Sequence, residues 1–218
     1  MSLDKSDRKV QPLVKRLQEI RRIQLKTTVF EFEHGTQRDM RQIKKWNRLA
    51  RDESNPNKLD SIDFANSVAS QWAEAREKRL LADNWHDFCA LIQNNPHEEV
   101  SVFVVVKALQ RSRRKLVALV YFRRTWCNNI YLDYVAVHPS LVDEPNRPIR
   151  DTGTVILYFI AWLAETIGAR AVWGMTTQNS VEFYRRIFGG KRIKDLLYLT
   201  EKDYKRFRES VDTLKETK

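Results

Sequence analysis

The chain has 218 residues, 42% of them hydrophobic, with six glycines and six prolines, which supports one globular domain with extensions and argues against a fibrous or disordered chain. Its formal net charge of +11 suits nucleic acid, an acidic protein or an anionic cofactor as a partner. No apolar run reaches the roughly 18 residues of a membrane helix, the N-terminus has no apolar signal core, and Cys89 and Cys127 lack metal-ligand spacing, so we expect a soluble, cytoplasmic protein without a metal.

Part of the positive charge lies in residues 1–28, which hold eight Lys or Arg against three acids, a net charge of +5. Val10, Leu13, Leu17 and Ile20 recur there at helical spacing. The segment is therefore predicted to be a basic amphipathic helix. Two interpretations stay open: a docked helix with one solvated face, or a helix that contacts nucleic acid or the ribosome.

The next segments alternate between strand and helix signals. Thr28 to Glu33 alternates like a strand, and helical patterns are predicted for Asp39 to Arg51, Ser61 to Ala82 and Asn84 to Gln93. Trp46, Trp72 and Trp85 are expected to fill the core beside these helices.

Three strands follow in a predicted meander: Val100 to Ala108, Leu116 to Arg123, and Ile130 to Val137. The first two form a hairpin whose turn carries the basic cluster Arg111, Arg113, Arg114 and Lys115, interpreted as a solvated turn.

The second half of the chain carries a phosphate-binding pattern. The strand that ends before Pro139 leads to the turn Arg150 to Thr154, and a buried helix from Val155 to Ile167 follows, closed by Gly168. Backbone N–H groups at a helix start, with Gly153 leaving them open and the Arg150 guanidinium beside them, attract a phosphate or pyrophosphate. A mononucleotide or a coenzyme A tail suits such a site.

Further strands are predicted from Ala171 and from Ile193 to Thr200. A strand, helix and strand in this order form a right-handed parallel crossover, while the preceding hairpin is antiparallel. Periodicity alone thus predicts an α+β fold with a mixed sheet.

Four pieces of this half resemble the acetyl-CoA-binding half of the GCN5-related N-acetyltransferase (GNAT) superfamily. They are Val137-His138-Pro139 at a strand end, Arg150-x-x-Gly153 opening a helix, the next strand, and Phe183-Tyr184 followed by Gly189-Gly190. Three departures stand out: Val155 replaces a small residue, Ser140 to Ile149 is a longer insertion, and Asn179 lies unusually close to Tyr184.

The resemblance implies a three-layer α/β/α arrangement around a mixed, mostly antiparallel, splayed central sheet. It covers roughly residues 29–200, leaving 1–28 as a basic extension and 201–218 as a charged C-terminal helix or tail. Homodimerisation is an expectation from the family.

The resemblance also implies the binding residues for acetyl-CoA, which enters a cleft where two central strands splay at a bulge. The predicted cofactor-binding residues are Val135, Ala136, Val137, Arg150, Thr152, Gly153, Thr154, Val155, Asn179 and Phe183.

Two side chains are candidates for catalysis. Tyr184 matches the family tyrosine that protonates the leaving sulfur, or else is a buried tyrosine with a structural hydrogen bond. Asp133 shares a strand face with Val137 and is predicted to be the general base, or else an ion-paired or substrate-orienting carboxylate. A backbone N–H near Val137 polarises the thioester. His138 is expected to face away and to cap the turn.

The implied function is an acetyl-CoA-dependent N-acetyltransferase that transfers acetyl directly to an amine whose identity the sequence does not show. An acidic lining of the cleft favours a cationic amine, and a basic lining favours one linked to nucleic acid. The alternative is a basic RNA- or ribosome-binding protein that reuses the fold without catalysis.

Overall fold

The computed structural model describes residues 5–51, 53–78, 81–110, 113–143, 149–190 and 193–216. Its helices are α1 (Lys5–Ile20), α2 (Gln37–Trp46), α3 (Pro56–Glu77), α4 (Trp85–Asn94), α5 (Thr152–Thr166), α6 (Val181–Phe188) and α7 (Glu201–Glu216), with short 3-10 turns η1 (Asn47–Ala50) and η2 (Pro139–Leu141). Its strands are β1 (Arg22–Leu25), β2 (Thr28–His34), β3 (Val100–Gln110), β4 (Arg113–Arg124), β5 (Ile130–Val137), β6 (Ala171–Met175) and β7 (Leu196–Thr200).

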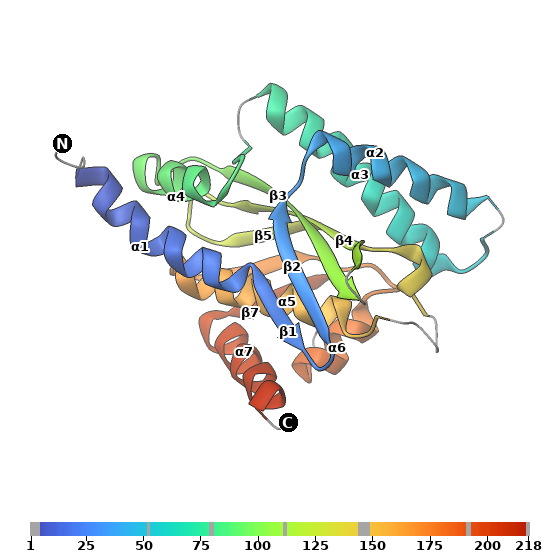
Figure 1. Cartoon of the computed structure of the whole chain (residues 1–218). Helices are drawn as coiled ribbons and strands as arrows, with labels where there is room; N and C mark the ends of the chain where they lie inside the picture. The colour runs from blue at the N-terminus through green and yellow to red at the C-terminus, as the bar shows by residue number, and fades with distance from the viewer. Residues whose placement is uncertain are drawn as a thin grey trace.

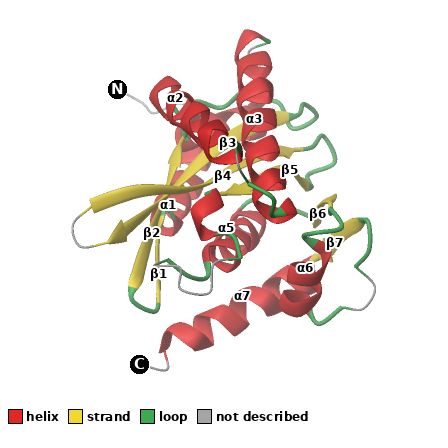
Figure 2. Ribbon diagram, turned by 90° about the vertical axis from the view of Figure 1, so that its right-hand side faces the viewer, coloured by secondary structure: helices red, strands yellow, loops and turns green. Residues whose placement is uncertain are grey.

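Within these residues the strands form one sheet in the sequential order β1 to β7 (Figure 2). Every neighbouring pair is antiparallel except β5 and β6, which run parallel because α5 connects them as a crossover. This is the mixed, mostly antiparallel sheet that the sequence predicts.

Helices cover both faces of the sheet and make three layers (Figure 1). On one face α1, α4, α5 and α7 bury a large apolar cluster, in which Phe32 stacks on Phe159 with ring centroids 4.2 Å apart. On the other face α2 and α3 bury a smaller cluster with Met40, Trp46 and Trp72. The α+β, three-layer prediction is confirmed, as is burial of the three tryptophans.

Local capping sets where the helices begin. α2 starts with a capping box, because Thr36 and Asp39 exchange hydrogen bonds across the first turn. α3 begins at Pro56, earlier than the predicted Ser61, because the Asn55 side chain accepts from the Asn57 N–H and proline suits the first helical position. The earlier start brings Asn57 and Asp60 into the helix that borders the site.

The N-terminal segment is part of the domain core. α1 buries Val10, Leu17 and Ile20 against α4 and α5, and its opposite face exposes Lys15 and Arg16. The helix thus docks on the domain with one face exposed, and contact of that face with nucleic acid or the ribosome stays a prediction. Residues 22–25, predicted as the end of the extension, instead form β1, since alternate residues Ile23 and Leu25 are buried. Among the described residues, none of the helices has the length and apolar character that crossing a bilayer requires.

Candidate functional site

The sheet splays between its two parallel strands. β5 and β6 pair only from Ile130 to Leu132 and from Val172 to Gly174, and they separate beyond this point. A Cβ on Gly174 would lie 2.6 Å from the Leu132 carbonyl oxygen, so only glycine permits this last close contact. The splay therefore begins at a fixed position.

A bulge on β5 accompanies the splay. Tyr121 pairs with Tyr134 and Phe122 with Leu132, so Asp133 is the extra residue. Beyond the bulge, the Val137 carbonyl accepts a hydrogen bond from Ser61 Oγ on α3, while the His138 N–H donates to Val117 on β4. Because alternate residues of a strand direct their backbone groups to alternate edges, Val135 and Val137 face the open edge, whereas Ala136 faces β4.

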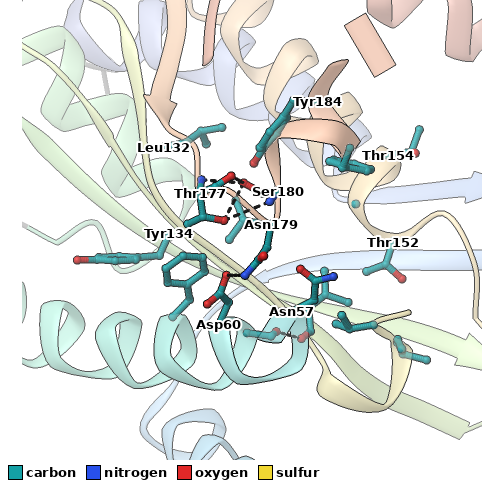
Figure 3. A pocket seen from close by; sticks show the side chains of 18 of the residues that line it. Asn57, Asp60, Leu132, Tyr134, Thr152, Thr154, Thr177, Asn179, Ser180 and Tyr184 are labelled. Carbon is teal, nitrogen blue, oxygen red and sulfur yellow. Dashed lines mark hydrogen bonds between the residues drawn. The ribbon is translucent and has the colours of Figure 1, made fainter. Parts of the chain in front are cut away.

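A cleft of about 310 Å³ occupies the opening (Figure 3). It reaches from α3 on one face of the sheet to the first turn of α5 and to α6 on the other. Nine predicted residues line it: Asp133, Val135, Val137, Thr152, Gly153, Thr154, Asn179, Phe183 and Tyr184. The structure thus brings together most of a site assigned from separate segments.

Three predicted cofactor residues lie outside this lining. The side chains of Ala136 and Val155 are fully buried in the two apolar clusters, and the Val155 N–H donates within the helix to Asp151. The branched Val155 side chain therefore points into the core and does not crowd the cleft. Arg150 is exposed to solvent. The cation that lines the cleft is instead Arg186, whose guanidinium lies 5.9 Å from the centre of the Phe183 ring.

The first turn of α5 has an unoccupied hydrogen-bonding group. Thr152 is 5% exposed, lines the cleft, and its Oγ1 has no hydrogen-bond partner among the described residues. Asp151 precedes it with a left-handed φ of 62° and provides no side-chain cap, since it pairs with Lys26 Nζ at 2.7 Å. A buried hydroxyl without a partner is costly unless a ligand supplies one.

Gly153 is required by its neighbour on α6. A Cβ there would lie 2.7 Å from Cζ of Phe183, so the aromatic ring rests directly on the glycine backbone. The sequence predicted a glycine that leaves the backbone open to a ligand; the structure adds that it also lets α6 approach α5. Phe183 and Tyr184 contact each other edge-to-face, with ring centroids 5.3 Å apart.

Tyr184 extends from α6 toward the middle of the cleft (Figure 3). Burial raises the pKa of Tyr184 to about 12. Within the described residues its hydroxyl takes part in no hydrogen bond, and it keeps its proton at neutral pH. The structural-hydrogen-bond alternative therefore finds no partner in this part of the chain.

Asp133 is held by an arginine. Its two carboxylate oxygens accept from Nε and Nη2 of Arg123 at 3.0 and 2.9 Å, and Arg123 also pairs with Glu99. Burial raises the pKa of Asp133, and the Arg123 contacts oppose that rise. The ion-pair interpretation is confirmed for these side chains, while the general-base role stays a prediction.

The α3 side of the cleft holds residues that sequence analysis missed. Asn57, Asp60, Ser61 and Phe64 line it, spaced so that one face of the helix meets the cleft. Asn179 Nδ2 donates to Asp60 Oδ2 at 2.7 Å (Figure 3). The other carboxylate oxygen, Asp60 Oδ1, accepts a hydrogen bond from no described residue. Helical spacing could have marked this face, but only the tertiary fold shows what it meets.

The remaining chemistry-bearing residues lie apart from the cleft. His138 caps η2 as predicted, its Nδ1 accepting from the Ser140 N–H at 3.2 Å. Cys89 is buried and burial raises the pKa of its thiol to about 12. Across the described ranges, no group of His, Cys, Asp and Glu could hold a metal ion.

No protein-family model matches the chain, and no curated protein matches it. Among solved structures, a chimeric spermidine N-acetyltransferase from Vibrio cholerae and hSSAT is 11% identical, with 81% of this chain and 98% of that chain covered and a TM-score of 0.41. A GNAT-family acetyltransferase from Listeria monocytogenes is 11% identical, with 82% and 97% covered and a TM-score of 0.40. A cAMP-binding acyltransferase from Mycobacterium smegmatis is 11% identical, with 96% and 60% covered and a TM-score of 0.34. Similarities of this size do not identify an activity.

Proposed function

We propose that the chain is a GNAT-type N-acetyltransferase that moves an acetyl group directly from acetyl-CoA to an amine. The observation that carries the proposal is the splayed β5 edge opening onto the first turn of α5, where Thr152 Oγ1 is buried without a partner. A strand edge with free backbone groups and a helix start with free donors suit the two polar parts of such a ligand.

The residues present fit an acyl-CoA. Thr152, Gly153 and Thr154 at the start of α5 would hold the pyrophosphate, with Arg186 as the neighbouring cation. Val135 would pair with a pantetheine amide along the open strand edge, and the Val137 N–H stays available for the thioester, since the Val137 carbonyl accepts from Ser61. Phe183 closes the cleft beside them, and Asn179 lies at its α3 side.

The chemistry divides among few groups. Acetyl-CoA supplies the acetyl thioester, and the neutral amine nitrogen forms a bond to the carbonyl carbon as the carbon–sulfur bond breaks. The Val137 N–H donates to the carbonyl oxygen as negative charge develops there. Tyr184 gives its hydroxyl proton to the departing sulfur. The amine nitrogen releases a proton to solvent, and Tyr184 takes one proton back from solvent.

The acceptor is an amine that carries a second, protonated amino group. Asp60 presents Oδ1 to the cleft with Asn179 fixing the other oxygen, and Phe64 and Tyr134 line the same end, their ring centroids 6.0 Å apart. A carboxylate in a cleft end that aromatic rings also line attracts an ammonium group.

Thermal unfolding with and without acetyl-CoA tests the proposal. Ligand at about 100 times its dissociation constant stabilises the folded protein by about 2.7 kcal/mol. Stabilisation by acetyl-CoA followed by thiol release with an amine supports the enzyme. No stabilisation at saturating acetyl-CoA would overturn it and leave the binding-protein alternative.

A further inference from the structure

A second concave surface lies on the opposite side of the end of β5. This basic groove of about 1120 Å³ runs between the α2–η1 segment and the start of β4. It is lined by Gln42, Lys45, Trp46, Leu49, Arg113, Arg114, Lys115, Leu116 and His138. Four of these side chains are cationic, and no acidic side chain is among the described residues that line it.

The basic wall continues along α2 beyond the groove. Arg38, Arg41, Lys45 and Arg48 are all exposed, and their spacing places them on one face of the α2–η1 segment. That row is roughly 15 Å long at the helical rise per residue. The opposite face of α2 is buried through Met40, Ile43 and Trp46, so the basic face is held rigidly outward.

Nearby acids of the described residues pair with one of the four cations that line the groove, Arg114, and leave the other three unpaired. Glu31 and Glu33 pair with Arg114, and Glu33 also pairs with Lys107 at 2.7 Å. Asp39 is buried and caps α2 through Thr36. Lys45, Arg113 and Lys115 form no ion pair with any described residue, and all three are exposed.

We propose that the basic groove binds the phosphate backbone of a nucleic acid, a function separate from acetyl transfer. Two facing walls of unpaired cations are complementary to a polyanion. A protein partner would be anchored by exposed aromatic or apolar residues. Here Trp46 is 3% exposed, and Leu49 at 46% is the exposed apolar side chain in the described lining. Charge without an apolar centre therefore favours nucleic acid over an acidic protein.

The groove does not feed the acceptor end of the cleft. The cleft and the groove share no lining residue, and the cleft presents Asp60, which would repel a phosphate. Binding in the groove thus anchors the protein to an anionic polymer while the cleft remains open.

Fluorescence anisotropy with a labelled single-stranded RNA of about 20 nucleotides tests the proposal across a salt series. The groove variant is Lys45→Gln, Arg113→Gln and Lys115→Gln together. The matched control, Lys15→Gln, Arg16→Gln and Arg22→Gln, removes the same charge from exposed positions on α1 and β1. Unchanged melting temperatures establish that both variants fold.

The wild type and the control should bind RNA with affinity that falls steeply with salt. Losing three phosphate contacts should weaken the groove variant at least about tenfold at low salt and flatten the slope of log affinity against log salt by about 2. Equal weakening in both variants would overturn the groove as the binding surface. Absence of RNA binding at low salt, or binding of poly-glutamate in its place, would overturn the nucleic-acid proposal.

Discussion

The cleft and the basic groove lie on either side of the end of β5, and they use charge in different ways. In the cleft, charged groups are oriented by specific partners: Arg123 holds Asp133, and Asn179 holds Asp60. In the groove, Lys45, Arg113 and Lys115 are exposed and unpaired within the described residues. Partly buried, oriented charges select a ligand by geometry, while exposed ones attract polyanions and are screened by salt. The net charge of the chain alone does not distinguish these two kinds of surface.

The largest expected effect is a loss of turnover on substitution in the cleft, with RNA binding in the groove unchanged. Tyr184→Phe removes the proposed acid and should lower kcat by about 10² to 10⁴-fold. Stabilisation by acetyl-CoA and RNA affinity should both remain, because the ring stays against Phe183 and the groove is untouched. Steady-state kinetics over a pH series and thermal shift measure these quantities. If turnover is unchanged at every pH, Tyr184 is not the acid, while the cofactor site survives.

A second substitution separates ligand binding from stability. Thr152→Val keeps the shape of the side chain and removes the unpartnered Oγ1. The free protein should become more stable by about 1 kcal/mol, while acetyl-CoA binding should weaken about tenfold. Urea unfolding and calorimetry measure the two changes. Thr166→Val at the other end of α5 is the matched control, because that hydroxyl donates to the Trp162 carbonyl and lies outside the cleft lining. Weaker binding with no gain in stability for Thr152→Val would show that the Thr152 hydroxyl makes a hydrogen bond within the protein.

The acceptor end can be tested with paired amines. Asp60→Asn should raise KM for 1,4-diaminobutane about tenfold, since the carboxylate pairs with the second ammonium group, and leave KM for butylamine unchanged. Asp63→Asn on the same helix is the control, because Asp63 is absent from the cleft lining. Equal changes in KM for both amines would show that Asp60 does not recognise the acceptor, while the proposal of acetyl transfer would stand.

The second half of the fold was predictable because its signals are local. The strand before Pro139, the turn with Gly153 and the pair Phe183-Tyr184 each encode one element and its end. Their order then implies the crossover, and the resemblance to the GNAT superfamily implies the splay. β1 was missed because four residues give a weak alternating pattern, and its pairing with β2 depends on a turn at Lys26 with a left-handed φ of 54°.

The cleft was less predictable where helices meet it from afar. Arg150 was chosen by motif position, but Arg186 lines the cleft because α6 packs on Gly153. Asp60 lies on the cleft-facing part of α3 because this helix begins before the predicted Ser61, at a position that the Asn55 cap determines. The solvated-turn interpretation of Arg113, Arg114 and Lys115 could not foresee that α2 places a second basic row opposite them. Such juxtapositions depend on packing and not on local pattern.

The smallest expected effect is a shift in the pKa of His138, a side chain that lines the groove. His138 packs edge-to-face on Trp46 with ring centroids 4.9 Å apart, and Ser140 occupies its Nδ1. Burial, with the positive charge of Lys115, lowers the pKa of His138 to about 4. Because Lys115 disfavours the protonated ring, Lys115→Gln should raise that pKa by a fraction of a unit, and bound RNA should raise it in the wild type. NMR titration of the ring protons measures both shifts. A pKa that responds to the substitution but not to RNA would show that the polymer binds elsewhere, since a phosphate in the groove cannot leave this imidazole unaffected.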